Sequence, residues 1–148
     1  ASGILPDLTV RGAPRSDAER ALLSALGEDI GPFRSVLANY AEDLHKTPGA
    51  PRFESFRVTG EMRNEVFARL EQIGLELSRT TFDNASAYID EQLGYEITRE
   101  LFGPAAEARR RALSDRQMQA AVRLLRRART QEEALTLAAA ERARVSSR

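Results

Sequence analysis

Apolar residues recur at three- and four-residue steps along most of the chain, which is the spacing of one face of an α-helix. The first such segment follows Ser16-Asp17-Ala18-Glu19, a capping-box pattern in which the serine hydroxyl and the glutamate carboxylate satisfy backbone N–H groups. We predict a helix over residues 17–26 that ends at Gly27. A second helix of three to four turns is predicted after Gly31-Pro32, because proline suits a first helical turn. Its apolar positions are Phe33, Val36, Leu37, Tyr40 and Leu44.

Two further helical stripes lie in the middle of the chain. Thr59 is a good N-cap for a third helix, and Gly74 can close it in the left-handed conformation. Its stripe consists of Met62, Val66, Leu70 and Ile73. The longest regular pattern then runs for about 20 residues and stops at Gly103-Pro104. Its apolar positions are Phe82, Ala85, Ile89, Leu93, Ile97 and Leu101.

Two more capping boxes follow, over residues 114–117 and 130–133. They predict one helix between them and a final helix that fades by about Val145. Residues 146–148 are then expected to form a frayed tail. The helix between the two boxes has an apolar side made of Met118, Ala121, Val122, Leu125 and Ala128.

Two segments favour extended backbone instead. Residues 1–15 carry early prolines and glycines and predict an extended arm, and residues 53–58 alternate weakly after a proline-rich loop. The sequence therefore predicts a mostly α fold: an irregular bundle of five to seven helices over residues 16–145, with an arm and room for one small β element. The predicted core comprises Leu22, Leu26, Phe33, Leu37, Tyr40, Met62, Val66, Leu70, Ile73, Phe82, Ile89, Leu93, Ile97, Leu101, Val122 and Leu125.

Composition narrows the classes of function. The 148 residues include 22 basic and 22 acidic side chains, so no whole-molecule field attracts nucleic acid or an anionic membrane. Cysteine is absent, which excludes disulfides, thiolate metal sites and cysteine nucleophiles. No apolar run approaches the roughly 20 residues of a membrane span.

No complete catalytic set is recognisable in the sequence. His45 is the only histidine and is expected at a helix C-terminus, where a cation is favoured, and Glu42 and Asp43 beside it point to different helical faces. The carboxylate pairs Asp90–Glu91 and Glu132–Glu133 are expected on solvated faces. Lys46 is the only lysine, and no phosphate-binding glycine loop or GxSxG motif occurs. We therefore predict no catalytic residue, no metal and no cofactor on this chain.

The strongest charge feature lies in residues 105–129. Eight arginines there face only Glu107 and Asp115, and such a stripe can bind phosphates. No aromatic residue lies among them to stack on bases, so docking on an acidic partner, or a hydrated face, is favoured over nucleic acid. The candidate interaction face is Arg109, Arg110, Arg116, Arg123, Arg126 and Arg127.

The opening segment resembles a known family. Ser2-Gly3-Ile4-Leu5-Pro6-Asp7-Leu8 is similar to the Gly-Gly-Ile-x-Pro-Asp-Val segment of carboxyl-terminal processing, or tail-specific, serine proteases, just downstream of their protease core. Serine stands for the first glycine and Leu8 for the usual valine. The motif residues that match are Gly3, Ile4, Pro6 and Asp7. The rest of the chain also resembles the C-terminal extension of some bacterial members.

The resemblance implies a non-catalytic C-terminal domain of a serine peptidase whose catalytic serine and lysine lie upstream. Its implied partners are the protease core and the PDZ domain of the same polypeptide, or a second copy in a homo-oligomer, and its implied location is the periplasm or cell envelope. The domain would pack on the core, self-associate or gate the cleft. The alternative is an independent helical module that binds nucleic acid or an acidic protein through the arginine-rich face.

Overall fold

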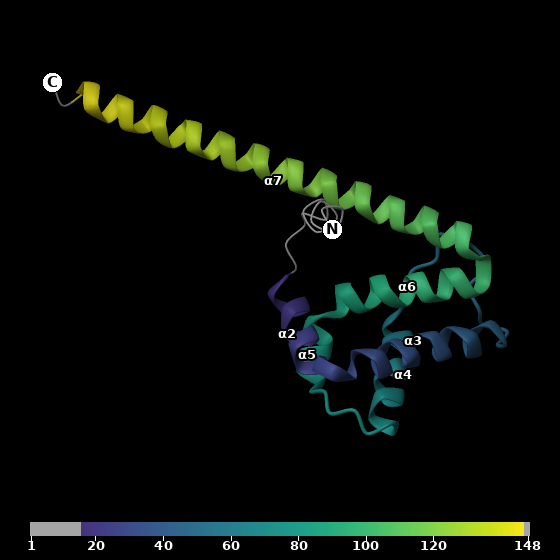
Figure 1. Ribbon diagram of the computed structural model, residues 1–148. Coiled ribbons are helices and arrows are strands. Elements are labelled where there is room, and N and C mark those ends of the chain that lie inside the picture. Colours follow the sequence, from purple (N-terminus) through teal and green to yellow (C-terminus); the bar gives the residue numbers. More distant parts are fainter. Residues whose placement is uncertain (1–15, 147–148) are drawn as a thin grey trace, which may run out of the picture. The chain divides into compact units, whose positions relative to one another are not determined.

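The computed structural model describes residues 16–146, and over this range the protein is a mostly α structure with no β-strand. The helices are shown in Figure 1. In chain order they are α2 (Asp17–Leu26), η1 (Gly27–Asp29, a 3₁₀ turn), α3 (Ile30–His45), α4 (Gly60–Gln72), α5 (Arg79–Asn84), α6 (Ser86–Phe102) and α7 (Pro104–Ser146). The predicted fold class is confirmed.

Two of the predicted N-caps, at Ser16 and Thr59, are formed. The Ser16 hydroxyl accepts the Glu19 N–H at 3.1 Å, and the Thr59 hydroxyl accepts the Met62 N–H at 3.2 Å. Each bond satisfies one of the backbone donors that a helix start leaves without a partner. Gly103 ends α6 with a φ of 94°, a conformation that favours glycine, and Pro104 then occupies the first position of α7.

The chain divides into two units between Ala112 and Leu113. We call residues 16–112 the compact unit and residues 113–146 the C-terminal segment. The core lies in the compact unit, where α3 packs mainly against α6, α2 against α5, and α4 against both α3 and α6. Its fully buried centre includes Leu22, Phe33, Leu37, Val66, Leu70, Phe82, Ile89, Leu93 and Ile97. Each such side chain contributes about 1.5–3 kcal/mol by burial.

The pattern from Phe82 to Leu101 predicted one helix, but the structure forms two. Ala85 lies between α5 and α6 with φ −96° and ψ 20°, and its N–H donates to the Phe82 carbonyl in a tight turn. Phe82 and Ile89 are both fully buried on either side of this turn. A one-residue break therefore leaves the apolar spacing intact, which is why the spacing did not reveal it.

The predicted β element at residues 53–58 is not formed. Phe56 donates its N–H to the Phe53 carbonyl at 3.1 Å, so the segment begins as a turn and continues as irregular backbone. A strand needs a neighbouring strand to satisfy its backbone. Here the carbonyls of Glu54 and Phe56 accept hydrogen bonds from the Arg110 side chain, both at 3.1 Å. The predicted arm, residues 1–15, lies outside the described residues.

Residues 104–146 form one helix, so the predicted helix starts at Ser114 and Thr130 are wrong. The Thr130 hydroxyl donates to the Arg126 carbonyl at 2.9 Å, as an interior helical threonine does. No glycine or proline occurs from residue 105 to residue 146, and alanine, arginine and leucine are strong helix formers. A capping box starts a helix only where the preceding residues leave the helical conformation.

Five predicted core residues are not buried. Ile73 is 55% exposed after the end of α4, and Leu125 is 70% exposed in the C-terminal segment. Met62, Leu101 and Val122 are partly buried. The other predicted core positions are confirmed.

Candidate interaction surface

The first turns of α7 hold three consecutive arginines, and each has a partner within the compact unit. Arg109 pairs with Glu54 at 2.6 Å, and this hydrogen bond lowers the pKa of the Glu54 carboxyl below its usual value. Arg111 pairs with Glu107 at 2.8 Å and its guanidinium lies 4.1 Å from the centre of the Tyr95 ring. The contacts with Glu54 and Tyr95 hold the first turns of α7, which belong to the compact unit, against the 53–58 segment and α6.

Arg110 is the most embedded of the three. Its guanidinium lies 4.4 Å from the centre of the Phe56 ring and donates to two carbonyls of the 53–58 segment. On its other side it lies against Gly94 of α6, where a Cβ would come within 2.9 Å of Nη2. Burial lowers the pKa of Arg110. Arg110 therefore joins α6, α7 and the 53–58 segment, and its role is structural.

The compact unit also has a hollow of about 330 Å³ over α3 and α6. Its lining residues are Phe33, Arg34, Leu37, Tyr88, Gln92, Glu96 and Arg111. They include no serine, histidine or lysine, and the Glu96 carboxylate is paired with Arg99. The lining therefore lacks a serine-type nucleophile with a base.

Several of the other residues considered for chemistry in the sequence make polar side-chain contacts, and Glu132 and Glu133 are exposed as expected. His45 ends α3 as predicted, and its half-exposed ring lies 3.2 Å from Glu100. Glu42 pairs with Lys46, and Asp43 pairs with Arg69. Arg63 Nη1 donates to both carboxylate oxygens of Asp90 at 2.7 Å. Among residues 16–146, no cluster of three or more potential ligands could hold a metal ion. No helix in that range has both the length and the apolar content to cross a membrane.

The C-terminal segment is different, because its apolar side chains are exposed. They are Leu113, Met118, Leu124, Leu125, Leu135, Leu137 and Val145. Leu113, Leu124 and Leu135 are 11 residues apart, or about three helical turns, and so share one face. An uncovered apolar face of this length is typical of an interaction site.

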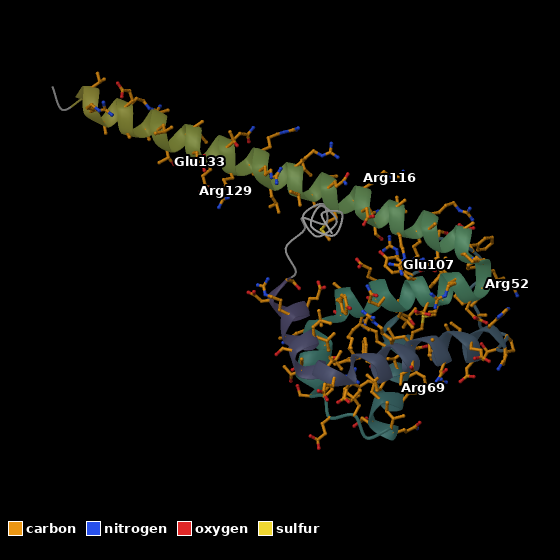
Figure 2. All side chains as sticks on the ribbon, in the orientation of Figure 1. Arg52, Arg69, Glu107, Arg116, Arg129 and Glu133 are labelled. Atoms are coloured by element: carbon orange, nitrogen blue, oxygen red, sulfur yellow. The ribbon has the colours of Figure 1, made fainter. Side chains whose placement is uncertain are left out.

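The charges of the C-terminal segment are also exposed. Five arginines there have no carboxylate within ion-pair distance among the described residues: Arg116, Arg123, Arg126, Arg127 and Arg129. Figure 2 labels Arg116, Arg129 and Glu133 along α7. The spacing of Arg116, Arg123 and Arg127, seven and then four residues, places them on one face. The six arginines of the candidate face thus divide: Arg109 and Arg110 are engaged, and the four from Arg116 onward are available.

Comparison with protein-family models, with curated proteins and with solved structures finds no match to this chain. The motif residues Gly3, Ile4, Pro6 and Asp7 lie outside the described residues. Sequence reasoning found the exposed arginines but missed the Arg110–Gly94 contact and the exposed leucines. The 11-residue leucine spacing was the available signal for the leucines. No short-range signal pairs Gly94 with Arg110.

Proposed function

We propose that this chain is a non-catalytic helical domain from the C-terminal region of a tail-specific serine peptidase, and that it acts by contact through its C-terminal segment. The observation that carries the contact role is the difference between its two units. In the compact unit most large apolar side chains cover one another, with Phe53 and Ile73 exposed, and among the described residues no buried side-chain nitrogen or oxygen lacks a hydrogen-bond partner. Residues 113–146 leave leucines and arginines uncovered.

The peptidase part of the proposal is supported by the resemblance of Gly3, Ile4, Pro6 and Asp7 to the family segment downstream of the protease core. In such a polypeptide the segment would pack on the core, self-associate or gate the cleft. The first test is the neighbouring coding sequence, which should continue upstream into a protease core containing the serine and the lysine. An upstream frame without such a core would overturn the assignment.

A second test uses the purified chain with an unfolded protein substrate. We expect no hydrolysis. Robust hydrolysis that survives alanine replacement of every serine and of Lys46 would show that the chain carries its own active site and would contradict the proposal. A contaminating protease is recognised because its activity separates from the chain on further purification.

The five arginines without carboxylate partners favour a second candidate, an independent module that binds nucleic acid or an acidic protein. Binding to a DNA duplex through phosphates would weaken steeply with salt, by roughly one unit of logarithmic slope for each contact. Absence of binding at about 50 mM salt removes the nucleic-acid form of this candidate.

A further inference from the structure

Three of the exposed apolar residues of the C-terminal segment, Met118, Leu125 and Leu135, lie in a regular seam. At alternating steps of three and four residues lie Met118, Ala121, Leu125, Ala128, Glu132, Leu135 and Ala139, which we call the seam. Leu125 is 70% and Leu135 is 68% exposed. Alternating steps of this kind keep one face of a helix in continuous contact with a second helix. The small alanines between the large side chains allow two helices to approach closely.

The charges along this helix are separated by sequence. Residues 114–129 hold five arginines and one acidic residue, Asp115, whereas residues 130–141 hold three glutamates and no basic residue. A second helix running in the opposite direction would place the basic half against the acidic half. A second helix running in the same direction would place like charges together.

We propose that the occupant of the seam is a second copy of this chain, with the two C-terminal segments paired as an antiparallel two-helix coil. The inference rests on the proposed contact role of the segment and does not depend on the peptidase assignment. The partner surface is the seam of the second copy. Each copy therefore offers the same surface to the other, as in a two-fold dimer. The centre of the contact lies at the level of Thr130.

The spacing of the seam fixes the register. Centred at Thr130, the pairing sets Leu125 level with Leu135 of the second copy, and Ala121 level with its Ala139. Leucine thus meets leucine and alanine meets alanine. Every seam residue from Ala121 to Ala139 finds a seam residue opposite. A shift by one heptad toward the N-terminus also pairs six seam residues, but it sets Leu125 against Ala128 and Glu132 against Ala121, so leucine no longer meets leucine.

Glu132 decides the direction of the pairing. In a parallel, in-register pair, this seam carboxylate would lie against its own copy, and like charges in contact are unfavourable. In the antiparallel pair it lies level with Ala128 of the second copy and beside that copy's Arg129. Two arginines and two glutamates then surround the two-fold axis, so the one charged residue of the central seam gains a partner of opposite charge.

Cross-linking tests the direction directly, because the chain has no native cysteine. Ala121→Cys and Ala139→Cys chains would each be treated with a short bifunctional maleimide, alone and as an equimolar mixture. We expect cross-linked dimer in the mixture and little in either variant alone. Cross-linking of each variant with itself would show a parallel pair, and no cross-linking in any sample would overturn the dimer.

A matched pair of leucines tests the face. Leu135 lies in the seam, and Leu137, which is 71% exposed, lies two residues away on the opposite side of the helix. Light scattering of the full chain should give twice the chain mass for the unsubstituted protein and for Leu137→Glu. Leu135→Glu should raise the dissociation constant by roughly 100-fold or more, because each dimer loses two buried leucines.

Equal weakening by both substitutions would move the contact off the seam, and a monomeric unsubstituted chain at high concentration would overturn the proposal. Either result leaves docking of the segment on an upstream protease core as a separate question, answered by the coding sequence and by the effect of Leu135→Glu on the whole polypeptide. Far-ultraviolet circular dichroism of both variants shows whether the helix itself has been lost.

Discussion

At the scale of single residues, Gly94 is the glycine of the described range with the closest neighbour, because a Cβ there would meet the Arg110 guanidinium. Glycine inside a helix costs about 1 kcal/mol relative to alanine. Here it leaves space for a guanidinium that would otherwise meet a Cβ at 2.9 Å. The same guanidinium satisfies two carbonyls of the 53–58 segment. The cost in helix propensity is therefore offset by a contact that joins three parts of the compact unit.

Replacing this glycine should destabilise the compact unit. We expect Gly94→Ala to lower the free energy of unfolding by about 1–2 kcal/mol, since displacement of Arg110 outweighs the gain in helix propensity. Urea unfolding followed by circular dichroism measures the change. Gly31→Ala in α3 is the control, because a Cβ there meets nothing within 4 Å and the substitution should be neutral or mildly stabilising.

The assignment to Arg110 is checked in an Arg110→Ala background. There, Gly94→Ala no longer displaces a guanidinium and should become neutral or stabilising. An unchanged penalty in that background would mean that the glycine is needed for some other contact.

Arg109 and Glu54 give a prediction for pH. The hydrogen bond from Arg109 lowers the pKa of the Glu54 carboxyl from its usual 4.5. The contribution of the Arg109–Glu54 pair to stability is therefore present above about pH 4.5, and it is lost as the pH falls through the lowered pKa of Glu54. In an NMR titration, Arg109→Ala should return the pKa of Glu54 toward 4.5, whereas Arg116→Ala should leave it unchanged.

At the scale of secondary structure, two threonines that were both predicted at helix starts have different outcomes. Thr59 caps α4, whereas Thr130 lies inside α7 and bonds to the carbonyl four residues earlier. We expect Thr59→Ala to lower the free energy of unfolding by about 1 kcal/mol. Thr130→Ala should leave it unchanged or slightly raised, because alanine is the better interior helix former. Denaturant titration of both variants makes the comparison, and equal losses would show that Thr130 also acts as a cap.

These outcomes show what the sequence can and cannot predict. Local patterns were sufficient where the whole signal lies within one turn, as at Ser16, Thr59 and Gly103-Pro104. They failed at Ala85 because a one-residue break preserves the apolar spacing, and at Thr130 because a cap depends on the residues before it. The exposed arginines from Arg116 onward could be predicted as a face from spacing alone. The engagement of Arg110 could not, because its partners lie 16 and more than 50 residues away along the chain.

At the scale of the whole molecule, the two units are stabilised by different means. Residues 16–112 are held by a core that they close themselves, with α3 against α6 at its centre. The helix of residues 113–146 has backbone hydrogen bonds but few buried side chains. Helices gain most of their stability from packing an apolar face. The C-terminal segment therefore depends on whatever covers its seam, and its stability should vary with the concentration of that partner.

Hydrogen exchange can separate the two kinds of stability. If a second copy covers the seam, amides between Ala121 and Ala139 exchange through dissociation, and the monomer fraction of a dimer falls as the square root of concentration. Their exchange should slow by about threefold for each tenfold rise in protein concentration. Amides of α3 and α6 should exchange at rates independent of concentration, because their core is closed within one chain. Leu135→Glu should abolish the concentration dependence and Leu137→Glu should preserve it. Protection that is the same at every concentration in the unsubstituted protein would show that the segment is stable without a second copy.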